Sequence, residues 1–165
     1  MRNISYEEAQ LFVKLSDFVL NQGDYFIFAE YEIIEKYEVG YKDIAKLREI
    51  GFLQSGDFVT SSFQTNPNSI SKVNFGYANH FLQFTFKPST IAVEIPVISL
   101  TQAGQEIYEL IESKPNWDYI RDLLLFIKKS KPSTTLHYGK ILEKNDNQVK
   151  YNAPLKEFHL DDIQK

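Results

Sequence analysis

The stretch from residue 91 to 112 constrains the fold more than any other part of the chain, because it has the pattern of a strand that runs directly into a helix. Apolar and small or charged residues alternate from 91 to 95, which is typical of a strand with one buried face. Pro96 cannot donate a ladder hydrogen bond, so we expect an edge strand or a bulge. Thr101 is placed to cap a helix that Lys114 and Pro115 end. The apolar positions of this helix recur at helical spacing: Ala103, Ile107, Leu110 and Ile111.

The composition is that of an ordinary soluble protein with many aromatic residues. The chain has 165 residues, enough for one well-buried domain, and its 13 Phe and 10 Tyr are expected mostly in the core. The absence of cysteine excludes disulfides, thiolate metal sites and cysteine redox chemistry. No apolar run approaches the ~20 residues of a membrane span, and residues 1–8 lack the apolar core of a secretory signal. We therefore expect a soluble, cytoplasmic protein without membrane contact.

Helical patterns dominate the N-terminal third of the chain. Ser5 and Glu8 have the form of a capping box, so a helix should begin there, and its apolar spacing continues to Val19 before residues 21–24 end it. Residues 25–28 are a short apolar run that fits either a strand or the start of a buried helix, and periodicity does not decide between them. Two more helices are predicted, over residues 30–37 and 41–50, and Gly51 closes the second of them.

The middle of the chain predicts a long insertion followed by a hairpin. Residues 55–80 place single aromatic residues between Ser, Asn, Thr, Gln and Gly, which is typical of an exposed loop or a loosely paired ribbon. Apolar residues alternate again from 81 to 87, and the chain then turns back at residues 87–90. We therefore predict a hairpin of residues 81–87 with 91–100.

A helix and two short strands are predicted in the C-terminal third. Asn116 caps the helix, which residues 130–132 end, and its apolar stripe consists of Ile120, Leu123, Leu124 and Ile127. Short strands are expected around residues 136–142 and 149–151.

Two motifs resemble those of winged-helix proteins. Residues 47–53, Leu-Arg-Glu-Ile-Gly-Phe-Leu, resemble the exit of a recognition helix into a strand. Residues 100–107, Leu-Thr-Gln-Ala-Gly-Gln-Glu-Ile, resemble the junction that follows the wing in many bacterial winged-helix regulators. The resemblance implies three helices followed by a β-hairpin wing.

More of the chain is similar to the C-terminal region of an uncharacterised family of bacterial proteins. The similar segments run from residues 4–12 through Gly51 to residues 100–106. The resemblance implies that the chain is part of a larger bacterial protein, and it implies a fold but no activity.

Together these patterns predict an α+β protein. Residues 1–114 are expected to form a winged-helix-like core, with a long wing insertion at about 55–80. Residues 115–152 add a helix and a short β-hairpin packed on the core, and residues 153–165 form a weakly ordered tail. One core cluster is expected to contain Leu47, Phe52, Leu100, Ile107 and Leu110.

Charge is distributed unevenly and argues against the duplex contact usual for winged helices. Residues 5–38 carry eight carboxylates against two lysines, whereas residues 114–150 carry eight cations against four carboxylates. Nucleic-acid affinity comes largely from neutralisation of the phosphates by cationic side chains. Acidic residues around the third helix would therefore repel DNA. The cations that would contact nucleic acid are Lys42, Lys46 and Arg48 in the third helix, and Lys128, Lys129 and Lys131 at the end of the C-terminal helix. The last three also fit a simpler role, since they complement the helix dipole.

The sequence favours a non-catalytic protein-interaction module, and a winged-helix DNA-binding regulator is the alternative. Aromatic residues in 55–86 exceed what one face of a small hairpin buries, so some are expected to bind a protein partner or a second copy. The expected partner surface consists of Phe58, Phe63, Phe75 and Tyr77.

No catalytic, cofactor-binding or metal-binding residue is predicted. The three histidines, His80, His137 and His159, have no second ligand at helical or hairpin spacing. Glu106, Glu109 and Glu112 share a helix but fit a solvated face better than a catalytic carboxylate pair. The seven glycines are scattered and form no phosphate-binding loop.

Overall fold

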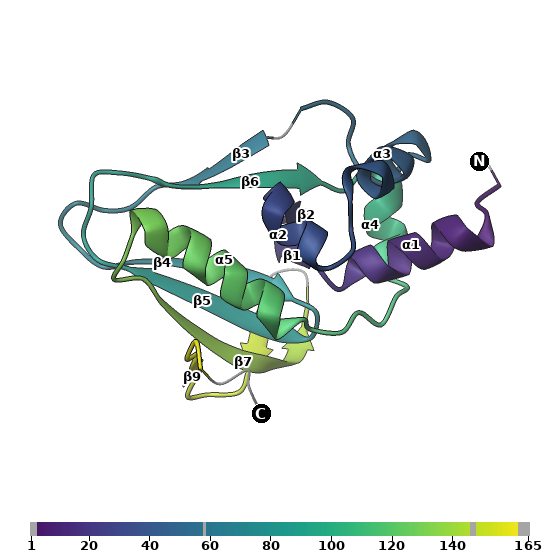
Figure 1. Ribbon diagram of the computed structural model, residues 1–165. Helices are drawn as coiled ribbons and strands as arrows, with labels where there is room; N and C mark the ends of the chain where they lie inside the picture. Colours follow the sequence, from purple (N-terminus) through teal and green to yellow (C-terminus); the bar gives the residue numbers. More distant parts are fainter. Residues whose placement is uncertain (1–2, 58, 146–147, 162–165) are drawn as a thin grey trace.

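A computed structural model of the chain, which describes residues 3–57, 59–145 and 148–161, contains helices and a large antiparallel sheet. The strand order is β3-β6-β2-β1-β4-β5-β7-β8, and β9 also pairs with β7. The α+β class is therefore confirmed (Figure 1). The helices are α1 (Tyr6–Ser16), α2 (Tyr31–Lys36), α3 (Tyr41–Glu49), α4 (Gln102–Tyr108) and α5 (Trp117–Ser130). The strands are β1 (Val19–Gln22), β2 (Asp24–Phe28), β3 (Val59–Phe63), β4 (Ser71–Tyr77), β5 (His80–Phe86), β6 (Val93–Ser99), β7 (Thr135–Lys144), β8 (Val149–Tyr151) and β9 (Lys156–Glu157).

The first helix begins as predicted but ends earlier. Ser5 and Glu8 form the capping box, with the Ser5 N–H donating to the Glu8 carboxylate at 2.8 Å. The helix ends at Ser16, and Val19 begins the β1–β2 hairpin, whose turn is centred on Gly23 at φ 85°. The prediction of a helix to Val19 was wrong because the apolar residues at its end also fit a strand. The open choice for residues 25–28 is resolved as strand β2.

The order of strand and helix in this stretch is confirmed, but α4 ends at Tyr108, earlier than the predicted end at Lys114 and Pro115, and the strand is not at an edge. β6 lies between β3 and β2, and the Thr101 hydroxyl accepts the Gly104 N–H at the start of α4. Pro96 lies opposite Ala29, one residue past the end of β2. It is tolerated there because the strand ladder has ended and needs no hydrogen bond donated by the residue 96 nitrogen. The prediction of an edge strand or bulge was therefore wrong.

The predicted hairpin of residues 81–87 with 91–100 was also wrong. β5 pairs with β4 on one side and with β7 on the other, while β6 pairs with β2 and β3. Residues 55–80 are not a loop throughout, because they contain β3 and β4. In β4 the buried Val73, Phe75 and Tyr77 alternate with more polar or smaller residues, which is the period of a strand with one buried face.

One core cluster joins the sheet to α5 and to the N-terminal helices, which contribute Phe12, Ile34 and Leu47 among others. α5 covers one face of the sheet, whereas α1, α3 and α4 gather at one end of it (Figure 1). The fully buried Tyr119 of α5 hydrogen-bonds both backbone groups of Phe28 in β2. Of the predicted cluster, Leu47, Phe52 and Leu100 are buried and Ile107 packs against them. Leu110 is 82% exposed, just beyond the end of α4, so its assignment was wrong.

The C-terminal third extends the sheet. Helix α5 and the pairing of β7 with β8 agree with the helix and the two short strands that were predicted here. Part of the segment expected as a weakly ordered tail is packed: β9 pairs with β7, and Phe158 is 7% exposed. A winged-helix core is not confirmed, because its strands belong to this much larger sheet.

Candidate functional site

The expected partner surface of Phe58, Phe63, Phe75 and Tyr77 is mostly core. Phe75 and Tyr77 are 3% and 1% exposed, so neither can contact a partner directly. The Tyr77 hydroxyl donates to the Asp17 carbonyl and accepts the Asn116 N–H, which joins β4 to the loops around it. Phe63 is half-buried, with its ring centroid 5.4 Å from that of Phe75. Phe58 lies outside the described residues.

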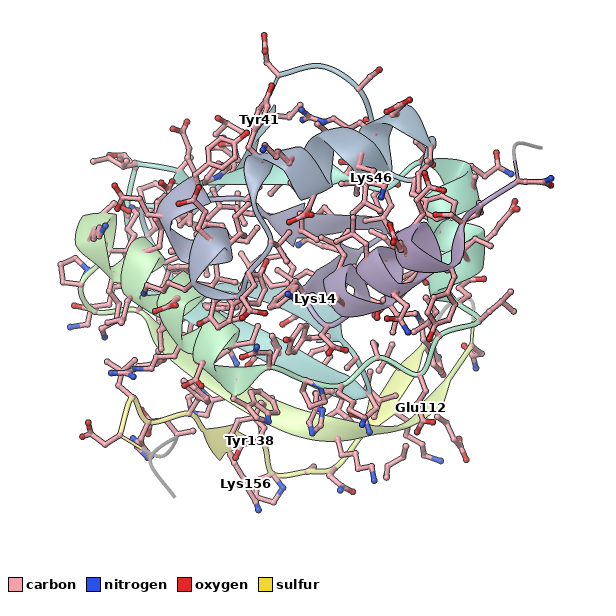
Figure 2. The ribbon with its side chains drawn as sticks, turned by 45° about the vertical axis from the view of Figure 1, so that its right-hand side comes forward. Lys14, Tyr41, Lys46, Glu112, Tyr138 and Lys156 are labelled. Atoms are coloured by element: carbon pink, nitrogen blue, oxygen red, sulfur yellow. The ribbon has the colours of Figure 1, made fainter. Side chains whose placement is uncertain are left out.

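The third-helix cations that could contact nucleic acid are partly engaged within the protein. Lys46 Nζ lies 3.9 Å from the Glu7 carboxylate of α1, and Arg48 Nε donates to the Gln54 carbonyl. Lys42 is exposed, as is the neighbouring Tyr41, which points away from the core (Figure 2). The α3 surface is therefore less cationic than its sequence suggests.

The C-terminal lysines make local contacts as well. Lys128 Nζ donates to the Thr134 carbonyl, and Lys131 Nζ donates to the Ile91 carbonyl. Lys129 Nζ lies 5.8 Å from the centre of the Phe126 ring. The contacts of Lys128 and Lys131 join the end of α5 to neighbouring loops, whereas that of Lys129 stays within the helix, so the cluster has a structural role.

A hollow of about 280 Å³ opens on the sheet face opposite α5. Its floor is a row of paired residues that crosses four strands: Tyr25, Asn21, Gly76 and Phe81. Because paired residues in neighbouring strands point to the same face, this register places their side chains on one surface. Gly76 has no side chain, so the row has a gap between Asn21 and Phe81.

The walls of this aromatic hollow come from α4 and from the β7–β8 hairpin. The Tyr108 ring of α4 lies 5.3 Å from the Tyr25 ring, and Lys144 Nζ lies 5.9 Å from the centre of Tyr25. The hairpin is held over the sheet by Tyr151, which stacks on Phe81 at 4.4 Å and 7° between ring planes. The aromatic hollow is lined by Asn21, Gly23, Tyr25, Asn74, Phe75, Gly76, Ala78, Phe81, Tyr108, Ile141, Lys144 and Val149.

A second hollow of about 280 Å³ adjoins the first and shares Ala78 and Tyr108 with it. We call it the acidic hollow, because Glu109 and Glu112 line it, together with Asn79, Ile111 and Ser113. The two hollows therefore form one groove that changes from aromatic to acidic at Tyr108. Figure 2 shows Glu112 at the surface of the molecule.

The groove keeps its phenol groups protonated. Burial, and after it the Glu109 carboxylate, raises the pKa of Tyr25, whose hydroxyl donates to Glu109 at 3.2 Å. Burial also raises the pKa of Tyr108. The residues that line the aromatic hollow include no Ser, Cys, His, Asp or Glu, so its described lining offers hydrogen bonds and apolar contact but no nucleophile beside a base.

Comparison with known proteins gives a family but no function. The sequence matches the family described as "Protein of unknown function (DUF2806)" over residues 1–124. The chain belongs to this family. The predicted resemblance to an uncharacterised family is thereby confirmed. No curated protein matches the chain, and no solved structure matches it.

The DUF2806 match covers the part of the chain that supplies most of the groove. The floor residues from Asn21 to Phe81 and the α4 wall lie within it, whereas Ile141, Lys144 and Val149 lie beyond it. Within the described residues, no helix is long and apolar enough to cross a membrane. The same residues contain no group of three or more His, Asp or Glu side chains placed to hold a metal ion.

The floor of the groove is not predicted by local sequence patterns. Phe81 belongs to the surplus aromatic residues of 55–86, but the sequence pattern places Asn21 at a helix end and Gly76 in an exposed loop or a loosely paired ribbon. The alternation through residues 71–77 was the available signal, because it puts Gly76 on the face opposite Phe75 and Tyr77. The pairing that brings Asn21 beside Gly76 links residues far apart in the sequence, and periodicity does not contain it.

Proposed function

We propose that this chain is a non-catalytic module that binds an extended segment of a partner protein in the aromatic and acidic hollows. The continuity of the two hollows across Tyr108 is the observation that carries the proposal. Pockets for drug-sized ligands usually enclose ~300–1,000 Å³, and each hollow is smaller than this. Two adjoining small hollows suit successive side chains of an extended peptide.

The lining of the groove defines the chemistry of the partner segment. The rings of Tyr25, Phe81 and Tyr108 favour a large apolar side chain, and the amides of Asn21 and Asn74 can bond its main chain. Glu109 and Glu112 favour a Lys or Arg that enters the acidic hollow. The partner segment therefore carries an apolar anchor followed within a few residues by a basic side chain.

Selection from a random peptide library displayed on phage tests this proposal. We expect enrichment of sequences with an aromatic or large aliphatic residue near a Lys or Arg. Binding of the selected peptides should be lost in Gly76→Val, because the new side chain fills the gap between Asn21 and Phe81. Gly76 has ordinary extended backbone, and an added Cβ meets nothing closer than 3.5 Å, so the strand accepts the change.

Thr85→Val is the matched control, since it adds a valine on β5, on the same face as Phe81 but outside the groove lining. This variant should bind the selected peptides as the parent does. Failure to enrich any motif, or equal binding by Gly76→Val and the parent, would refute the proposal.

DNA binding is the second candidate, and one observation favours it. The helices and strands α1, β2, α2, α3, β3 and β6 follow one another in the order of a winged helix, with β6 between β3 and β2. In that interpretation the β4–β5 hairpin is an insertion within the wing. The engaged cations of α3 count against a duplex contact.

Polarisation titration with duplex DNA at two salt concentrations distinguishes the two functions. A winged-helix reader binds tightly, and its affinity falls steeply with salt. We expect weak binding. If binding does occur, reversing Lys128, Lys129 and Lys131 to glutamate should lower it more than reversing the three α3 cations. The opposite ranking in folded variants would identify α3 as the DNA-reading helix.

A further inference from the structure

A separate hollow of about 180 Å³ lies on the α5 face of the sheet, where the C-terminal segment crosses β7. Its volume corresponds to roughly six water molecules at ~30 Å³ each, enough for one small solvated ion. It is lined by His80, Tyr138, Gly139, Lys140, Asn152, Pro154 and Lys156. None of these lining residues takes part in the groove proposed above.

Strand register places the cationic and polar side chains of this hollow together. His80 of β5 pairs with Lys140 of β7, and Tyr138, two residues earlier in β7, pairs with Lys156 of β9. Residues two apart in a strand point to the same face, so all four side chains share one surface. Figure 2 shows Tyr138 and Lys156 near each other, at the end of the molecule opposite Tyr41.

The carboxylate that follows Lys156 in β9 is directed elsewhere. Glu157 follows Lys156 and pairs with His137, so the alternation places it on the opposite face, where it lies 4.0 Å from His159. Asp118, in the first turn of α5, is exposed and does not line the hollow. The described lining therefore has two lysines and no carboxylate.

His80 lines the same hollow as these two lysines. Its ring lies 4.9 Å from Trp117 of α5, and its Nδ1 is buried without a hydrogen-bond partner among the described residues. Burial lowers the pKa of His80, and Lys140 lowers it further. An anion in the hollow would offset the charge of Lys140 and so favour the protonated ring.

We propose that this hollow binds a small tetrahedral oxyanion, either free phosphate or sulfate or the terminal phosphoryl group of a small phosphate monoester. Lys140 and Lys156 supply the positive charge, and the Asn152 amide and the Tyr138 hydroxyl supply neutral hydrogen bonds. Gly139 lets the 152–155 segment pack closely against β7 beside the hollow, because a Cβ there would lie 2.9 Å from the Asn152 carbonyl oxygen and 2.8 Å from Leu155.

NMR titration of the full chain tests the site, with inorganic phosphate as the probe at constant ionic strength. We expect saturable shifts of the His80 ring signals and a higher His80 pKa when phosphate is bound. Lys140→Gln and Lys156→Gln should each weaken phosphate binding about fivefold, since an exposed ion pair contributes up to about 1 kcal/mol. Both lysines are exposed, so neither variant should lose its fold.

Lys72→Gln is the matched control, because it removes the same charge from β4 on the opposite sheet face. It should change phosphate affinity less than about twofold. Equal weakening by Lys72→Gln, or shifts that do not saturate, would show general charge attraction and overturn the proposal. A parallel titration with glycerol 3-phosphate identifies the source of the anion: tighter binding than inorganic phosphate indicates a monoester, and weaker binding indicates the free ion.

Discussion

Tyr119→Phe tests the contact that joins α5 to the sheet. Ala29 donates to the Pro96 carbonyl across β2 and β6, so the preceding residue, Phe28, turns its N–H and C=O away from β6. β1 begins at Val19, opposite Ile27, and provides no strand partner for Phe28. The Tyr119 hydroxyl replaces that partner, accepting the Phe28 N–H at 2.7 Å and donating to its carbonyl at 3.0 Å.

Removal of this one oxygen leaves two buried backbone groups unpaired. Phe28 and Tyr119 are both fully buried, so water cannot replace the hydroxyl without rearrangement. A buried unpaired group costs about 1–3 kcal/mol, so with two such groups we expect Tyr119→Phe to lower the free energy of unfolding by about 2–6 kcal/mol. The ring is retained, which excludes a large cavity as the cause.

Urea denaturation followed by the fluorescence of Trp117, the single tryptophan of the chain, measures this loss. Tyr6→Phe is the control, because the Tyr6 hydroxyl is hydrogen-bonded to Gln10 on the exposed face of α1 and should change stability by less than about 0.5 kcal/mol. Equal stability losses in the two variants would refute the argument. Faster hydrogen exchange of the Phe28 amide in Tyr119→Phe would support it independently.

Two further predictions concern packing and pH. Gly104→Ala should destabilise the protein by about 1–3 kcal/mol in urea denaturation, although alanine favours helices, because the new Cβ would overlap the Phe52 carbonyl oxygen; a more stable variant would contradict this close approach. Stability should fall as the pH drops below 6.5, because burial and Lys140 hold the pKa of folded His80 below that value and the unfolded chain binds the proton more readily. His80→Phe should lose this part of the pH dependence, and an unchanged pH profile would contradict the assignment.

Local signals in the sequence predicted individual elements well. The Ser5 capping box and the Thr101 cap depend on residues within one helical turn, so the sequence contains the whole interaction. The errors arose where one pattern fits two structures. Phe18 and Val19 continue the helical spacing of α1, yet Val19 begins strand β1, and the hairpin with β2 decides between the two structures.

Strand partners were not predictable in the same way. β5 and β6 follow each other in the chain and both alternate, yet β5 pairs with β7, about 50 residues away in the sequence, where Leu136 packs beside Phe84. The candidate groove depends on such pairings, because Asn21 and Phe81 approach each other only through β4. Local sequence patterns therefore do not predict which residues of the groove lie side by side.

The position of β7 beside β5 also bears on what the family boundary means. The DUF2806 match ends at residue 124, inside α5, before any part of β7. A chain cut there would lose the last turns of α5, and the backbone amides and carbonyls of β5 that face β7 would lose their partners, although those that face β4 would keep theirs. An unpaired strand of this kind is a template for aggregation. The segment that matches the family is therefore shorter than the segment that builds the whole sheet.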